Sequence, residues 1–242
     1  MTALVLSSSL GTSGAMWDPQ VAPLGERFDV ITYDLRGHGS TPATPGPYEI
    51  ADLAQDVLAL LDARGIERAH FCGLSIGGMI GMWLAAHAPT RIECLIVCCS
   101  SPHAPPAENW RERARTVRAA GSTEPIADTV AGRWLTPGFA ERHPDIRARL
   151  RAMLVACDPE GYAACCGAIE RMDLRADLGA ISAPTLVIGA ADDPSLPVDP
   201  HTDAIADGIP GARREIVAGA HIANVESADA VTDLILDHLE AT

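Results

Sequence analysis

The segment Cys72-Gly73-Leu74-Ser75-Ile76-Gly77-Gly78 contains the pattern G-x-S-x-G, which runs from Gly73 to Gly77. A strand-like run at residues 68–72 precedes it, and a helix-like run at residues 76–87 follows it. In that context the pattern predicts a nucleophile elbow, a tight strand-to-helix turn that holds a serine in a strained conformation. The flanking glycines leave room for the backbone to reverse. Ser75 would then lie at a helix N-terminus, whose free N–H groups favour developing negative charge.

Composition narrows the classes of protein that the chain can belong to. Its 242 residues suit one domain, or one domain with an inserted subdomain. The formal net charge of −14 makes nucleic acid and anionic membrane surfaces poor partners. The seven cysteines include no C-x-x-C pair, so we expect buried reduced thiols rather than a metal or redox dithiol site. With no targeting segment or membrane span evident, the sequence predicts a cytoplasmic protein.

Short apolar runs alternate with helical patterns along most of the chain. Strands are expected at residues 2–8, 28–33, 69–72, 92–99, 185–188 and 214–217. Helices are expected at residues 50–64, 76–87, 202–206 and 228–239. This alternation predicts an α/β fold, with a mostly parallel sheet covered by helices on both faces.

The middle of the chain has a different pattern. Residues 107–178 contain no strand-like run, and their helical patterns are broken at Gly121, Pro137, Pro144 and Pro159. Asp158 is a plausible N-cap, followed by a proline at the first helical position. We therefore predict a core formed by residues 1–103 and 180–242, with a helical cap inserted at residues 104–179.

A serine nucleophile needs a base, and the base needs an acid that orients it. In folds with such an elbow the acid and then the histidine follow the serine in the chain. His221 follows the last expected strand through small residues and precedes the last helix. Asp192 and Asp193 both follow the strand at residues 185–188, and neighbours in an extended loop point in different directions. We favour Asp193 as the acid and His221 as the base.

An oxyanion hole requires two backbone N–H groups directed at the developing charge. One is expected from Ile76, directly after the nucleophile. The other should come from the loop that follows the first strand, Ser8-Ser9-Leu10-Gly11-Thr12, and we favour the N–H of Leu10.

Several longer motifs make the chain resemble the α/β-hydrolase family, and within it the 3-oxoadipate enol-lactonases. These motifs are S-L-G-T-x-x-x-M-W-D-P-Q at 9–20, D-L-R-G-H-G-S-T at 34–41, G-L-S-I-G-G at 73–78, R-W-L-T-P-G-F at 133–139, G-Y-A-A-C-C-G-A-I at 161–169, M-D-L-R at 172–175, D-P-S-L-P at 193–197 and G-A-H-I-A-N-V-E at 219–226. The acid loop supports Asp193, although Ala190 replaces a usual glycine. Family members usually begin with an extra pair of strands, so we expect the sheet to lack its antiparallel edge. The exposed strand edge could then favour a homodimer.

The resemblance implies a serine hydrolase that opens 3-oxoadipate enol-lactone to 3-oxoadipate in aromatic catabolism, without metal or organic cofactor. It also implies that a cap residue binds the substrate carboxylate. We expect Arg133 in that role, because a guanidinium binds a carboxylate bidentately, with Trp134 packing over the ring. One alternative is a carboxylesterase or lactonase of the same fold that acts on another small ester. A more remote alternative is a non-catalytic ligand-binding protein.

Overall fold

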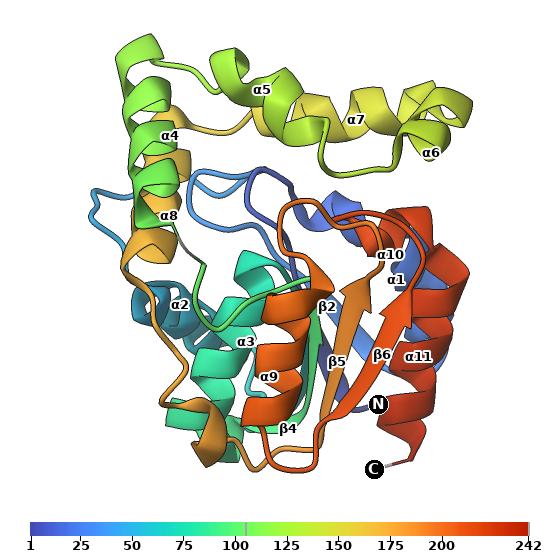
Figure 1. Cartoon of the computed structure of the whole chain (residues 1–242). Helices are drawn as coiled ribbons and strands as arrows, with labels where there is room; N and C mark the ends of the chain where they lie inside the picture. The colour runs from blue at the N-terminus through green and yellow to red at the C-terminus, as the bar shows by residue number, and fades with distance from the viewer. Residues whose placement is uncertain (105, 242) are drawn as a thin grey trace.

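The computed structural model describes residues 1–104 and 106–241, and its centre is a six-stranded parallel sheet (Figure 1). The strand order is β2-β1-β3-β4-β5-β6. The strands are β1 (Ala3–Ser7), β2 (Asp29–Thr32), β3 (Ala69–Leu74), β4 (Ile92–Cys98), β5 (Thr185–Ala190) and β6 (Arg213–Val217). Every pairing is parallel, so the described sheet has no antiparallel edge, as the sequence predicted. All six expected strands are present.

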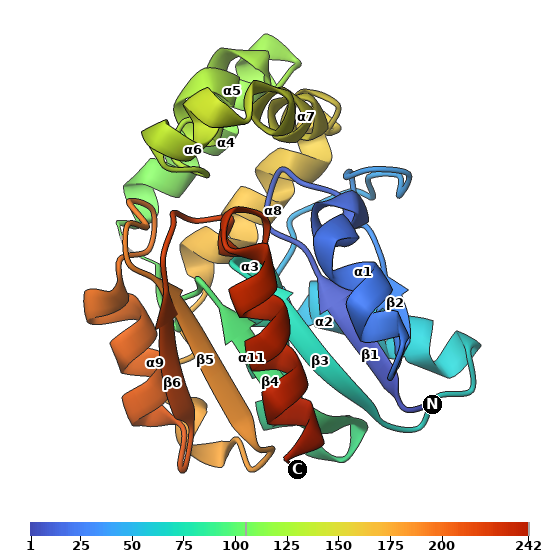
Figure 2. The same ribbon diagram turned by 90° about the vertical axis from the view of Figure 1, so that its right-hand side faces the viewer.

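Helices cover both faces of the sheet (Figure 2). On one face lie α1 (Asp18–Gly25), α10 (Ala223–Glu226) and α11 (Ala228–Glu240), and on the other lie α2 (Ile50–Ala63), α3 (Ile76–His87) and α9 (Asp203–Gly208). In α2 the buried residues Leu53, Val57 and Leu61 recur at helical spacing and bury one stripe against the core. The expected α/β architecture is therefore confirmed.

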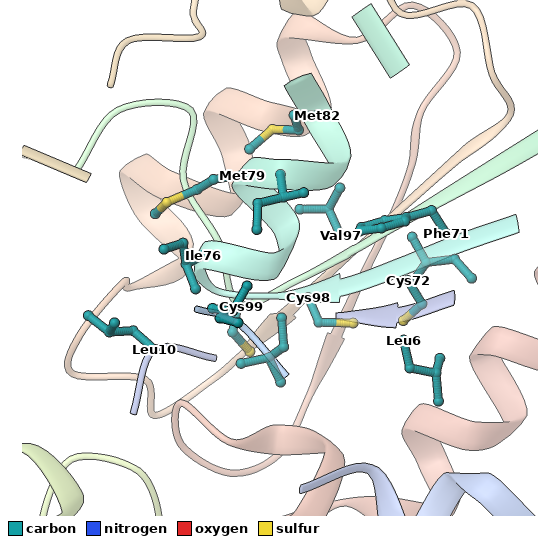
Figure 3. Packing of buried hydrophobic residues seen from close by; sticks show 14 of the residues in the cluster. Leu6, Leu10, Phe71, Cys72, Ile76, Met79, Met82, Val97, Cys98 and Cys99 are labelled. Atoms are coloured by element: carbon teal, nitrogen blue, oxygen red, sulfur yellow. The ribbon is translucent and has the colours of Figure 1, made fainter. Parts of the chain in front are cut away.

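Aliphatic, thiol and thioether side chains fill most of the core between sheet and helices. Figure 3 shows part of this packing, in which Leu6 and Cys72 from the strands lie close to Cys98. Cys72 and Cys98 are buried free thiols. No helix in residues 1–104 and 106–241 combines the length and apolar character that crossing a bilayer requires.

Sequence reasoning missed the short helix α10 and also helix α1. It contains Pro19 at its start and Pro23 inside, and it buries only Gln20 and Leu24. Prolines and a narrow apolar stripe both argue against a helix. Its packing against α11 supplies the stability that its own sequence lacks.

Among the described residues, five α-helices lie between β4 and β5 in the chain and cover the carboxyl ends of the strands (Figure 1). They are α4 (Ala107–Ala120), α5 (Glu124–Ala131), α6 (Pro137–Arg142), α7 (Pro144–Val155) and α8 (Pro159–Arg171). Gly121 ends α4 with a φ of 61°, and α6, α7 and α8 each begin at one of the expected prolines. Asp158 caps α8 as predicted, because its side chain accepts the N–H of Gly161 at 3.0 Å.

The start of α8 is seated directly on a loop of the core. A Cβ added to Gly37 would lie 2.6 Å from Cα of Gly161, and the reverse substitution would give the same clash. The N–H of Asp158 also donates to the carbonyl of Gly37 at 2.8 Å. Glycines are required here because two backbones meet, and this contact fixes the height of the five helices above the strand ends.

Candidate active site

Ser75 lies in the turn between β3 and α3 with a strained backbone, at φ 58° and ψ −118°. Such a conformation costs about 1–3 kcal/mol for a residue with a Cβ and persists only where its surroundings impose it. Here the N–H of Ser75 donates to the carbonyl of Cys98 at 2.9 Å. Its own carbonyl accepts the hydroxyl of Ser100 at 2.7 Å. The next strand, β4, therefore holds the turn in place.

The two glycines of the pentapeptide are required by close backbone contacts. A Cβ on Gly73 would lie 2.1 Å from the carbonyl oxygen of Gly77. A Cβ on Gly77 would lie 2.4 Å from the carbonyl oxygen of Ser7 in β1. The G-x-S-x-G pattern is therefore the sequence signature of a turn that presses against its neighbouring strand.

His221 and Asp193 form a buried pair. Nδ1 of His221 lies 2.7 Å from Oδ2 of Asp193, and both residues are nearly inaccessible to solvent. A carboxylate only accepts hydrogen bonds, so Nδ1 carries the proton and Nε2 is left as the basic nitrogen. The other carboxylate oxygen, Oδ1, accepts the N–H groups of Ser195 at 2.7 Å and Leu196 at 3.1 Å.

These contacts decide the charge of Asp193. Burial by itself raises the pKa of a carboxyl group, but His221 and the two N–H donors outweigh burial here, so the pKa of Asp193 lies below its usual value. The neighbouring Asp192 is exposed, and its backbone N–H donates to the carbonyl of Gly219 at 3.0 Å. Of the two candidates, the structure brings only Asp193 to the histidine.

The two expected oxyanion donors border the serine. Ile76 is the first residue of α3, so its N–H lies outside the hydrogen bonds of the helix. In the described part of the chain, no protein acceptor pairs with the N–H of Leu10. Figure 3 shows Leu10 and Met79, which both line the cavity above Ser75, at the N-terminal end of α3. The role of the two N–H groups remains a prediction.

A buried histidine that sequence reasoning did not select holds the Leu10 loop. The N–H of Gly11 donates to Nε2 of His38 at 3.0 Å, and Nδ1 of His38 lies 3.1 Å from the carbonyl of Arg36. Nε2 must therefore be unprotonated, and Nδ1 carries the hydrogen. Burial lowers the pKa of His38, although the Arg36 carbonyl and the charge of Asp34 act in the opposite direction. The ring is a neutral acceptor that fixes the loop beside Leu10.

One cavity joins the core to the helices above it. Its lining residues come from both parts: Ser9, Leu10, Ser75, Met79, Ala104, Asn109, Trp110, Arg113, Val130, Arg133, Trp134, Ser195, Leu196 and His221. The predicted pocket residues Arg133 and Trp134 are both in this lining, with Trp134 buried and Arg133 exposed. Arg113 and Trp110 were not predicted to line the pocket. Their position on the apolar side of α4 was the signal that could have identified them.

The histidine loop is tied to the segment that carries Trp134. The N–H of Ile222 donates to the carbonyl of Trp134 at 2.9 Å. The carboxylate of Glu226 accepts the N–H of Ala220 at 3.1 Å, the N–H of Thr136 at 2.9 Å and the hydroxyl of Thr136. Glu226 therefore links the loop beside His221 to the wall of the cavity, which the sequence did not reveal.

Several known proteins are similar to this chain over most of its length. A family model described as the alpha/beta hydrolase fold matches residues 2–151. A 3-oxoadipate enol-lactonase 2 from Acinetobacter baylyi is 43% identical over 234 residues, which cover 94% of this chain and 85% of the relative. A putative carbamate hydrolase, RutD, from Variovorax paradoxus is 34% identical over 258 residues, covering 98% of this chain and 91% of the relative.

A solved structure has the same overall arrangement. The enol-lactonase from Burkholderia xenovorans LB400 superposes with a TM-score of 0.96 and is 42% identical. The superposition covers 99% of this chain and 91% of the enol-lactonase. The similarity thus extends over the helices above the sheet as well as the sheet itself.

Proposed function

Because the chain belongs to the α/β-hydrolase family, we propose that it is a serine hydrolase that opens 3-oxoadipate enol-lactone to 3-oxoadipate in aromatic catabolism. The observation that carries the proposal is one cavity lined by a strained, buried serine and by a histidine paired with a buried carboxylate. The 43% identity to a 3-oxoadipate enol-lactonase supports the substrate.

In the proposed reaction Ser75 attacks the lactone carbonyl while Nε2 of His221 takes its proton. Asp193 keeps the histidine in the required tautomer and stabilises the imidazolium that forms. The N–H groups of Leu10 and Ile76 receive the oxyanion. The imidazolium of His221 gives its proton to the ring oxygen, which leaves as an enol and becomes a ketone by tautomerisation. Water activated by His221 then hydrolyses the acyl-enzyme, and the cycle needs no metal or organic cofactor.

The substrate side of the cavity supports a small anionic ester. Trp134 is a buried aromatic wall, and Arg133 supplies positive charge at the exposed side. A local arginine is needed because the whole chain carries a net charge of −14, which opposes the approach of an anion. The same charge argues against nucleic acid and anionic membranes as partners.

Three experiments test the proposal. Ser75→Ala should abolish turnover of the enol-lactone while the circular dichroism spectrum stays that of the wild type, and retained turnover would require another nucleophile. The alternative of a general carboxylesterase or lactonase is tested by comparing kcat/KM for the enol-lactone with that for simple aryl esters. Faster hydrolysis of the aryl esters would favour that alternative. Failure of Ser75 to react with a fluorophosphonate probe would favour a non-catalytic ligand-binding protein.

Location and assembly belong to the same proposal. We place the enzyme in the cytoplasm, since buried free thiols such as Cys72 and Cys98 suit a reducing compartment. The parallel sheet ends at β2, whose outer edge pairs with no strand among the described residues. This edge is the surface that we propose for a homodimer, and a monomeric mass in solution would contradict it.

A further inference from the structure

Helix α4 places one arginine on its inner side. The buried residues Ala114 and Val117 mark that side, and the half-buried Trp110 and Arg113 lie with them at spacings of three and four residues. A guanidinium is rarely buried among apolar groups unless an anion pairs with it, because removing the charge from water is costly.

The other arginines of α4 behave differently from Arg113. Arg111, Arg115 and Arg118 point outward, and each pairs with a glutamate: Arg111 with Glu108 and Glu170, Arg115 with Glu108, and Arg118 with Glu160. Within residues 1–104 and 106–241, no carboxylate lies within ion-pair distance of Arg113. The one α4 arginine that lines the cavity is thus the one that no protein anion neutralises.

Arg113 is held in position before any ligand arrives. Its guanidinium carbon lies 4.7 Å from the centre of the Trp110 ring, and Nε1 of Trp110 donates to the carbonyl of Ala104 at 2.8 Å. Burial raises the pKa of Tyr162, and both the positive charge of Arg113 and a hydrogen bond from its guanidinium act in the opposite direction. A preorganised cation loses little conformational entropy when it binds an anion.

We propose that Arg113, supported by Trp110, is the residue that binds the distal carboxylate of an acyl substrate whose carbonyl lies at Ser75. This assignment rests on the proposed hydrolase function and specifies its substrate class: esters and lactones with a free carboxylate on the acyl part. Arg133 lines the same cavity but is exposed, so water weakens its pairing with an anion. Arg133 attracts the anion, and Arg113 fixes its position.

Two aryl esters that differ only in charge test this role. Mono-4-nitrophenyl adipate carries a terminal carboxylate, and 4-nitrophenyl hexanoate has the same acyl length without it. Arg113→Met should lower kcat/KM for the adipate ester about 10- to 100-fold, the loss expected for a charge-assisted hydrogen bond, mainly through KM. For the hexanoate ester the change should stay within about threefold. Arg113→Lys keeps the charge but not the planar guanidinium, so its kcat/KM for the adipate ester should lie between the values of Arg113→Met and the wild type.

Arg115→Met is the matched control, since it removes an exposed arginine from the same helix and should change neither ester. Equal losses for both esters in Arg113→Met would assign Arg113 a purely structural role and overturn the proposal. An unchanged kcat/KM for both esters in Arg113→Met would also overturn the proposal. If Arg133→Met instead lost kcat/KM for the adipate ester alone, the role would belong to Arg133. If Arg113→Met does not fold, a Ki for adipate unchanged in Arg113→Lys would overturn the assignment.

The two levels of inference can fail separately. If the wild type discriminates between the two aryl esters through Arg113 but does not hydrolyse 3-oxoadipate enol-lactone, the enol-lactonase function fails and the carboxylate site stands. If the wild type opens the enol-lactone and Arg113→Met has the same KM for it, the function stands and the site assignment fails.

Discussion

Replacing Glu226 should weaken both the fold and catalysis, because one carboxylate joins the loop of His221 to the wall of the cavity. Three hydrogen bonds end on it, two from the N–H groups of Ala220 and Thr136 and one from the hydroxyl of Thr136. Glu226 is half-buried, so water can replace part of each interaction. We take about 1 kcal/mol for each bond, and Glu226→Ala should then lose about 3 kcal/mol of unfolding free energy.

That loss corresponds to a fall in Tm of about 6–12 °C for a chain of this size, measurable by calorimetry. Activity should fall as well, because Ala220 directly precedes His221 and Ile222 is bonded to the carbonyl of Trp134. Small misplacements of a catalytic group cost up to about 100-fold, so we expect kcat/KM to fall about 10- to 100-fold.

Glu226→Gln is the matched control for this prediction. The amide oxygen of glutamine can accept both N–H groups, and its NH2 can donate to the hydroxyl of Thr136. This variant should therefore keep most of the stability and activity that Glu226→Ala loses. A Glu226→Ala variant with the Tm and kcat/KM of the wild type would refute the reasoning. Equal losses of Tm and kcat/KM in both variants would show that the negative charge of Glu226, rather than its hydrogen bonds, stabilises the loop.

Two further predictions concern the acid and the loop of Leu10. Asp193→Asn should lower kcat about 10³- to 10⁴-fold, because His221 loses the group that orients it. Asp192→Asn should change kcat by no more than about twofold. A larger loss in Asp192→Asn than in Asp193→Asn would assign the role of the acid to Asp192. His38 has a folded-state pKa below 6.5, so the folded protein binds fewer protons than the unfolded chain as the pH falls below about 6.5. The contribution of His38 to the free energy of unfolding is therefore fully present above that pH. Below it, this contribution decreases by up to about 1.4 kcal/mol per pH unit. Between pH 7.5 and 5, the free energy of unfolding measured with urea should change less with pH in His38→Gln than in the wild type. An equal change in the two proteins would contradict the role of His38.

Periodicity and local turn chemistry predicted most of the fold. The bounds of α3 agree with the expected helix at residues 76–87, because the glycine turn defines its start and its side chains are nearly all buried. Helix α4 ends at Gly121, and α6, α7 and α8 each begin at an expected proline; the conformational limits of these residues are local. Helix α1 escaped detection since its stability comes from contacts with α11, which lies about 200 residues further along the chain.

Some residues of the site could also be predicted from the sequence, and others could not. Ser75 and the histidine are marked by their loops. Chain order limits the acid to Asp192 or Asp193, and the resemblance of residues 193–197 to the family's acid loop favours Asp193. His38 carries no local mark, because what distinguishes it is the N–H of Gly11. Arg113 is marked only by its position on the apolar side of α4, and the sequence does not show that it has no carboxylate partner among the described residues. Both properties depend on which segments meet in space, and no pattern of neighbouring residues encodes that.

The loops that carry the proposed oxyanion donor and the proposed base also meet below the cavity. The side-chain amide of Asn224, three residues after His221, donates to the carbonyl of Met16 at 2.9 Å, and Gln20 donates to the carbonyl of Asn224 at 2.9 Å. The sulfur of Met16 in turn accepts the N–H of Ser9, directly before Leu10. These groups are fully buried, so breaking one contact leaves polar atoms without water or partner. The geometry between Leu10 and His221 is therefore fixed by the same buried network that stabilises the fold, which means that the site is preorganised before substrate binds.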